Sequence, residues 1–287
     1  MTDIRQEQLA GLIREWVTNT EGGAFTYEQL DRDLIIKTTG GRNTRRQVIK
    51  RLKDEGVIVA AGHQAGAYRL VIDEAPVIPW QTADEGQSLD LILPFGMHEL
   101  VRILPKTIIV IAGAPDAGKS AWCFNFIRHN MAKHHITYFS SEMGEVELKS
   151  RLSKFASLRP EQWTFEARER STNFADVIRP NGVNMIDYME VSADFFLVGS
   201  WIRAIWEKLD QGIAIICLQK KRGVDHGRGG EITAEKARLY LSMDNGIIKI
   251  IKAKNWVDSE VNPNGMAWSF RLVQGCKFAN IQESVAT

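Results

Sequence analysis

The segment from residue 113 to residue 120 constrains this chain more than any other. It reads Gly113, Ala114, Pro115, Asp116, Ala117, Gly118, Lys119 and Ser120, and it matches the phosphate-binding loop G-x-x-x-x-G-K-[ST] at every fixed position. A β-branched run at 107–112 precedes it and is typical of a buried strand, and 121–127 follows with a helical pattern. Glycines let backbone N–H groups converge on phosphate oxygens, and the helix N-terminus adds its dipole. The segment therefore predicts nucleotide binding rather than an incidental glycine-rich turn.

The expected ligands of this loop are ATP and Mg²⁺. Lys119 is expected to reach the β- and γ-phosphates, and the Ser120 hydroxyl is expected to ligate Mg²⁺. The predicted nucleotide-binding segment extends to Ala121, at the start of the following helix.

The composition limits the classes of function. A chain of 287 residues has room for about two domains, and its net charge of +1 means that any nucleic-acid surface must be local. Cys123, Cys217 and Cys276 are widely spaced and lack a zinc-ligand pattern, so we expect buried free thiols. We find no signal-peptide pattern and no long apolar stretch, and therefore expect a cytoplasmic protein.

The hydrophobic pattern divides the chain into three parts. Residues 1–73 predict helices at 4–18, at 27–34 and from 43 or 44 to 54, then a hairpin of 57–60 and 67–71, which together are similar to a winged helix-turn-helix. Residues 74–88 contain two prolines and predict a linker. Residues 89–287 alternate strands with helices, which predicts an α/β fold with a mostly parallel sheet and helices on both faces.

The third predicted helix carries a concentrated positive charge. Its basic residues are Arg42, Arg45, Arg46, Lys50, Arg51 and Lys53, with no acidic residue between them. A helix that lies in a DNA groove needs such a distribution, and we assign Arg42, Arg45, Arg46 and Lys50 to DNA contact. A solvated helix face and a protein-docking module remain alternatives.

Three polar residues follow predicted strands of the larger domain. Glu142 comes after the strand 136–141 and is the candidate that orients or deprotonates the attacking water. Asp187 follows the apolar run of the strand 183–188 and is the candidate that holds Mg²⁺ through water. Gln219 ends the strand 212–219 and is placed to sense the γ-phosphate. The alternatives are a helix-start glutamate for Glu142 and an ordinary loop residue for Asp187.

Two basic segments follow. The glycine-rich loop 220–230 carries Lys220, Lys221, Arg222 and Arg228, which are assigned to a nucleic-acid backbone, with a solvated loop as the alternative. In the strand 247–253, period two places Lys252 on the same face as Lys254, where the two could reach a neighbouring subunit's phosphates. Arg238 is a second candidate for that role, although a structural ion pair is the preferred interpretation of this residue.

Two charged segments are expected to be helical, 166–170 with ion pairs on its face and 231–241 after the basic loop. A hairpin of 266–273 and 276–280 is expected to close the chain.

Taken in order, the phosphate loop, residues 139–143 (FSSEM), Asp187, Gln219 and the segment 250–254 (IIKAK) resemble the RecA/DnaB group of P-loop ATPases. FSSEM is similar to the segment with the catalytic glutamate in DnaB-type helicases. IIKAK is similar to the RecA strand whose lysines act on the adjacent subunit's ATP. Trp256 stands where DnaB-type proteins usually carry an arginine. The resemblance covers residues 89–280 and, with the winged-helix-like domain, points to phage or mobile-element proteins.

The resemblance implies a DNA-dependent ATPase in replication or recombination. We expect an oligomeric ring or filament that acts as a translocase or helicase on single-stranded DNA. The alternative is an ATP-regulated loader or a recombinase-like strand-binding protein without unwinding activity. Duplex DNA and replication proteins are further expected partners. A small-molecule kinase is disfavoured because the sequence has no lid-like arginine cluster.

Overall fold

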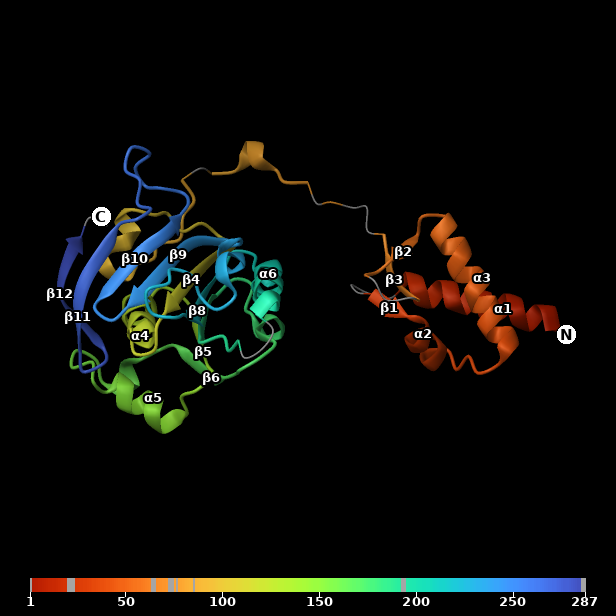
Figure 1. Cartoon of the computed structure of the whole chain (residues 1–287), viewed down its shortest axis with the longest axis horizontal. Coiled ribbons are helices and arrows are strands. Elements are labelled where there is room, and N and C mark those ends of the chain that lie inside the picture. The colour runs from red at the N-terminus through yellow and green to blue at the C-terminus, as the bar shows by residue number, and fades with distance from the viewer. Residues whose placement is uncertain are drawn as a thin grey trace. The chain divides into compact units, whose positions relative to one another are not determined.

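The computed structural model describes residues 2–19, 24–62, 66–71, 75, 77–84, 86–191 and 195–284. The chain divides into two compact units, Met1–Ala83 and Asp84–Thr287, whose elements are labelled in Figure 1. The division falls inside the segment expected to be a linker, of which Glu74, Pro76 and Glu85 lie outside the described residues.

The described part of the N-terminal unit consists of three α-helices and a small antiparallel sheet. The helices are α1 (Thr2–Thr18), α2 (Tyr27–Asp33) and α3 (Thr39–Asp54). The strands are β1 (Ala24–Thr26), β2 (Ile58–Ala60) and β3 (Ala67–Leu70), in the order β1-β3-β2. The three expected helices and the hairpin are present, and β1 is a strand that the sequence did not predict.

Local capping explains where these helices begin. Thr26 and Gln29 form a capping box at the start of α2, in which the Thr26 hydroxyl accepts from the Gln29 N–H at 3.3 Å and the Gln29 side chain accepts from the Thr26 N–H at 2.8 Å. Helix α3 starts earlier than expected because the Thr38 hydroxyl caps it, accepting from the N–H of Gly41 at 3.1 Å. Gly56, with φ of 73°, follows its end.

The C-terminal unit is built on a sheet in the order β12-β11-β10-β9-β4-β8-β7-β5-β6. The six strands from β9 to β6 are parallel, whereas β10, β11 and β12 run antiparallel to their neighbours. The strand bounds are β4 (Thr107–Gly113), β5 (Ile136–Ser140), β6 (Glu166–Glu169), β7 (Val183–Asp187), β8 (Ile213–Gln219), β9 (Ala237–Asp244), β10 (Ile247–Ala253), β11 (Ala267–Val273) and β12 (Lys277–Ser284).

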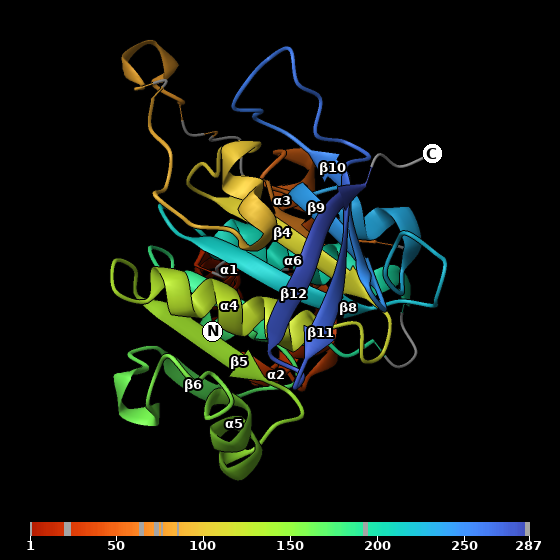
Figure 2. The same cartoon turned by 90° about the vertical axis from the view of Figure 1, so that its left-hand side faces the viewer.

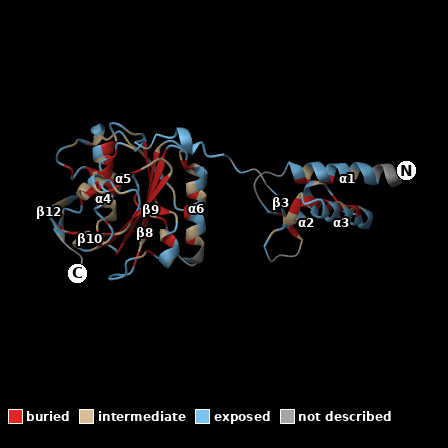
Figure 3. Ribbon diagram, turned by 90° about the horizontal axis from the view of Figure 1, so that it is seen from above, coloured by how far each residue is buried: buried red, intermediate tan, exposed pale blue. Residues whose placement is uncertain are grey.

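Helices cover both faces of this sheet, as Figure 2 and Figure 3 show. The side chains of β4 alternate: Ile109 and Ile111 pack in one core with α4 (Lys119–Asn130), and Ile108 and Val110 pack in the other with α6 (Val198–Lys208). Every residue of β4 is buried, which explains its continuous apolar sequence. The sheet is the expected mostly parallel α/β core.

The remaining helices are short. Helix α5 (Glu145–Leu152) follows β5. Short 3₁₀ segments occupy Trp80–Thr82, Pro94–Glu99, Pro160–Gln162, Phe174–Val177, Phe195–Leu197 and Gly230–Ala234. The second of these is interrupted by a kink at Phe95 and Gly96, where the backbone is not helical. None of the described helices combines the length and the apolar character needed to cross a membrane.

Two expectations about secondary structure are wrong. Residues 166–169 form strand β6, which pairs with β5, and not a charged helix. The segment 231–241 is not a helix either, because after a short 3₁₀ turn it enters β9, which pairs with β4. In both cases pairing with a buried strand overrides the local helical pattern.

Candidate active site

The phosphate-binding loop leaves the end of β4 and enters α4. Gly118, the residue before α4, has φ of 102°, a left-handed conformation that glycine adopts without strain. At Gly113 an added Cβ would lie 2.6 Å from Cγ of Lys119, so the lysine stem can fold along the loop only because this residue has no side chain. The motif therefore needs glycine at these two positions for different physical reasons: backbone conformation at Gly118 and lack of space at Gly113.

Lys119 bends back over the loop. Its ammonium donates to the carbonyl oxygens of Gly113 and Ala114, at 3.1 Å each. The N-terminal turn of α4 begins at the same place, and its first backbone N–H groups have no carbonyl partner within the helix. The loop therefore combines a cation with N–H donors, which is the chemistry of an anion site.

The strand order brings the predicted polar residues to one edge of the sheet. Gly113 of β4 pairs with Gln219 of β8, and Ser140 of β5 pairs with Asp187 of β7. A cavity of about 600 Å³ opens at this edge. Its lining includes Pro115, Asp116, Gly118, Lys119, Ser120, Ala121, Glu142, Asp187 and Gln219.

Asp187 lies at the floor of this site. It is 4% exposed, and its carboxylate accepts a hydrogen bond from the Tyr138 hydroxyl at 2.6 Å. Burial, with the nearby carboxylate of Asp187, raises the pKa of Tyr138 well above its ordinary value, so this hydroxyl stays a donor.

The thiols of Cys123 and Cys217 lie near Asp187, 3.5 Å from each other. Burial raises the pKa of Cys123 well above its ordinary value, which keeps that thiol protonated. Like Cys276, both are buried and free, as the sequence predicted.

Glu142 is exposed on the turn after β5. The Ser140 hydroxyl accepts from the N–H of Met143 at 2.8 Å and fixes this turn, and the Ser141 hydroxyl accepts from the N–H of Tyr188 at 3.2 Å. Burial raises the pKa of Tyr188, and the neighbouring carboxylate of Glu142 raises it further. Tyr188 is a site residue that the sequence analysis missed, although it directly follows Asp187.

Two other parts of the lining were not predicted. Glu147 and Arg151 of α5 form an ion pair at 2.7 Å, and Leu272 and Gly275 come from the β11–β12 hairpin. The hairpin lies over the phosphate loop: a Cβ added at Gly118 would be only 3.4 Å from the side chain of Leu272. Only the distant pairing of β11 with β10 brings it there, so no local signal could have shown it.

Lys252 and Lys254 lie far from the phosphate loop of their own chain. Strand β10 runs antiparallel to β9, so Ala253 pairs with Leu239 near the start of β9, while Met243 near its end pairs with Gly113. Burial lowers the pKa of Lys252, and the positive charge of Lys254 lowers it further. Arg238, which precedes Leu239, lies at the same end of β9.

Most residues assigned to DNA are exposed, but two are not. On α3, Arg42, Arg46 and Lys50 are exposed, as are Lys221, Arg222 and Arg228 of the basic loop.

Arg45 is the first correction: it is 5% exposed, its guanidinium bonds to the carboxylate of Asp31, and it lies 4.1 Å from the ring centre of Tyr27. Lys220 is the second, with a fully buried side chain whose ammonium lies 2.6 Å from a carboxylate oxygen of Asp244. Both cations are therefore buried against carboxylates of the protein and are not presented to solvent.

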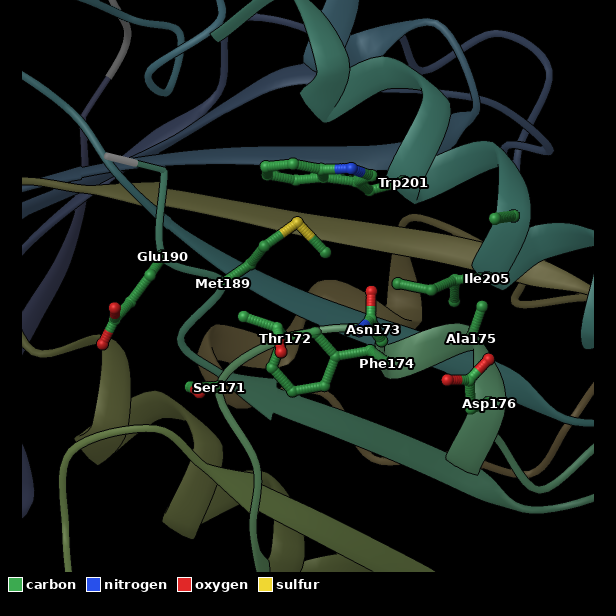
Figure 4. Close-up of a pocket in the computed structure, with 11 residues that line it drawn as sticks. Ser171, Thr172, Asn173, Phe174, Ala175, Asp176, Met189, Glu190, Trp201 and Ile205 are labelled. Atoms are coloured by element: carbon green, nitrogen blue, oxygen red, sulfur yellow. The ribbon is translucent and has the colours of Figure 1, made fainter. Parts of the chain in front are cut away.

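A separate cavity of about 400 Å³ lies beside α6, on the opposite face of the sheet from α4 (Figure 4). Phe174, Met189, Trp201 and Ile205 give it an apolar character. Its charged lining residues, such as Glu190, are acidic, so it does not suit a polyanion. None of the predicted site residues lines it.

Comparison with solved structures finds similar folds. A KaiC-like protein from the hyperthermophilic archaeon Pyrococcus horikoshii OT3 superposes with a TM-score of 0.51 at 12% identity, covering 68% of this chain and 99% of that one. The RadB recombinase is also similar, with a TM-score of 0.46 at 12% identity, covering 62% of this chain and 92% of that one. The ATPase domain of G40P has a TM-score of 0.46 at 16% identity, covering 62% of this chain and 86% of that one. No protein-family model and no curated protein matches the sequence. The first likeness supports the α/β fold with its large, mostly parallel sheet.

Proposed function

We propose that this chain is a DNA-dependent ATP hydrolase of the RecA/DnaB type that acts in replication or recombination. The observation that carries the proposal is the single cavity lined by Lys119, Ser120, Glu142 and Asp187. A cation, a hydroxyl and two carboxylates around a phosphate-binding loop are the groups that phosphoryl transfer to water requires.

The residues of the cavity fit ATP and Mg²⁺. The triphosphate would lie against the N–H groups at the start of α4, and Lys119 would exchange its two carbonyl contacts for phosphate oxygens. Ser120 and Asp187 offer the oxygen ligands that Mg²⁺ prefers, and this ion would neutralise charge on the phosphates. Glu142, which neighbours Tyr188, would accept the proton of the attacking water, and Gln219 would sense the γ-phosphate.

We further propose that the working form is a ring or filament of identical subunits. Lys252 and Lys254 lie at the end of the sheet away from their own phosphate loop, so they could serve only a neighbour's nucleotide. The exposed ammonium of Lys254 is the better placed of the two, because the ammonium of Lys252 already donates to the carbonyl of Glu235 at 3.3 Å.

The DNA-binding surfaces are proposed in two places. The helices and strands of the N-terminal unit follow the order of a winged helix-turn-helix, with α3 as its recognition helix. The exposed residues Arg42, Arg46 and Lys50 of α3 recur every fourth position and so share one face, suited to the backbone of duplex DNA. In the other unit, Lys221, Arg222 and Arg228 of the basic loop would contact single-stranded DNA.

The rate of ATP hydrolysis, with and without single-stranded DNA, tests this proposal. We expect Lys119→Ala to abolish turnover and the wild type to be stimulated by DNA. Lys149→Ala, which removes an exposed lysine of α5 that lines no part of the cavity, serves as the matched control. Turnover that survives Lys119→Ala would contradict the assignment of the site.

Mixed assemblies test the shared site. Glu142→Ala subunits and Lys252→Ala/Lys254→Ala subunits should each be inactive alone. Mixing them should restore part of the activity, because some interfaces then pair an intact glutamate with intact lysines. Absence of recovery in assemblies that are demonstrably mixed would count against action across subunits.

The exposed basic face of α3 also supports a second candidate, an ATP-regulated loader that does not unwind DNA. A strand-displacement assay separates the two. Unwinding of the duplex supports a helicase. Tight binding to a duplex site supports the loader if the protein does not unwind DNA and if single-stranded DNA does not stimulate its ATP hydrolysis.

A further inference from the structure

A second large cavity, of about 630 Å³, lies on the other side of the β11–β12 hairpin from the phosphate loop. It is bounded by α4, by the segment 154–157 and by the hairpin. Leu272 and Gly275 face the phosphate-loop cavity, whereas Gln274 and Lys277 line the second one. One hairpin therefore forms a wall of both cavities.

The second cavity carries an uncompensated positive charge. Arg128, His129, Lys154 and Lys277 line it, and no acidic residue does. None of the three permanent cations takes part in an ion pair between described residues. The Nε of Arg128 is buried without a hydrogen-bond partner among the described residues. Such an unpaired donor costs free energy, while a terminal nitrogen of the same guanidinium lies 3.0 Å from Nε2 of His129.

The same cavity offers flat apolar surface. Phe95, Phe155 and Phe278 line it, and the rings of Phe95 and Phe278 are 4.8 Å apart between their centres. The guanidinium of Arg128 lies 5.8 Å from the ring centre of Phe155. Aromatic rings beside cations are the combination with which proteins hold a base and its phosphate.

We propose that this cavity is a second binding site, for a phosphate ester that carries a flat base. The ligand is either a free nucleotide or one nucleotide unit of a single-stranded polynucleotide, since both present the same chemistry. Arg128, Lys154 and Lys277 bind the phosphate, and the half-buried rings of Phe95 and Phe278 contact the base.

Binding of two probes to the full-length protein tests the inference. The probes are adenosine monophosphate, followed by equilibrium dialysis, and a fluorescent oligothymidylate, followed by anisotropy over a range of salt concentrations. The variant is Lys154→Ala/Lys277→Ala, in which both side chains are exposed and neither lies in the proposed ATP machinery. The matched control, Lys149→Ala/Lys208→Ala, removes the same charge from exposed helix positions outside the cavity.

For a free nucleotide, we expect the variant to weaken binding of the monophosphate by about tenfold or more relative to the control. If the ligand is a polynucleotide, we expect the variant to weaken binding of the oligonucleotide but not of the monophosphate. The slope of log K against log salt concentration should then be smaller by about 1.4, because each of the two lost phosphate contacts contributes about 0.7. Either result supports the site and identifies its ligand. Equal affinities of the variant and the control for both probes, or no binding of either probe by the wild type, would overturn it. ATP turnover is measured separately, so a failure of the proposed ATPase would not be mistaken for a failure of this site.

Discussion

Asp244→Ala tests whether Lys220 is a structural residue. The side chain of Lys220 is completely buried and that of Asp244 is 29% exposed, with 2.6 Å between the ammonium and the carboxylate. Breaking a buried pair by removing one partner costs about 3–5 kcal/mol, and the partial exposure of Asp244 favours the lower end, about 3 kcal/mol. For a unit of this size, about 2–4 °C per kcal/mol gives a fall in Tm of about 6–12 °C.

Thermal and urea unfolding of the full chain, followed by circular dichroism, measure this loss. The control is Asp225→Ala, which removes the carboxylate partner of Lys249 from a pair at 3.4 Å whose side chains are 36% and 49% exposed. Exposed pairs contribute about 0–1 kcal/mol, so the control should change stability little. If Asp244→Ala is no more destabilising than Asp225→Ala, the structural assignment of Lys220 is wrong and the lysine is free to serve the basic loop.

Three further changes have defined outcomes. Tyr240→Phe removes the hydroxyl that accepts from the N–H of Gly227 at 2.8 Å, and we expect a loss of about 1–3 kcal/mol in urea unfolding because a buried donor is left unpaired; an unchanged midpoint would contradict this. Gly212→Ala places a Cβ 2.2 Å from the carbonyl oxygen of Gly182, so we expect clear destabilisation in a thermal shift assay, and a wild-type Tm would refute the close approach. Burial raises the pKa of Tyr27 to about 12, from an ordinary 10.0. The folded N-terminal unit thus holds this proton more tightly than the unfolded chain, and stability that is complete below pH 10 should fall as pH rises through 12. Tyr27→Phe should weaken that dependence, and an unaltered profile would exclude Tyr27 as its source.

The parallel strands and the phosphate loop could be predicted because their signals are local. Strands β4 and β8 are buried on both faces, so they are continuous apolar runs. Because parallel strands end at one edge of the sheet, a polar residue after each run marks the site, and this rule placed Asp187, Glu142 and Gln219 in one cavity. The fold of the larger unit and the centre of the site were therefore accessible from sequence.

The errors arise where the deciding contact is distant in sequence. Arg45 and Lys220 are basic residues within basic segments of the sequence, which is the pattern expected of DNA-binding residues. Their partners, Asp31 and Asp244, lie 14 and 24 positions away and turn them inward. The β11–β12 hairpin lines the site for the same reason, since only tertiary pairing brings it over the loop.

Strand β6 could not be recognised from the sequence because three of its four residues, Glu166, Arg168 and Glu169, are charged. It is the last strand of the sheet and, among the described residues, pairs only with β5, so its outer edge offers backbone groups that no described strand pairs with. Short, charged end strands resist recruitment by another chain. Glu166 adds ion pairs to Arg168 and Arg179, at 2.6 and 2.7 Å. The charges that made β6 difficult to recognise as a strand therefore also oppose edge-to-edge pairing at this end of the sheet.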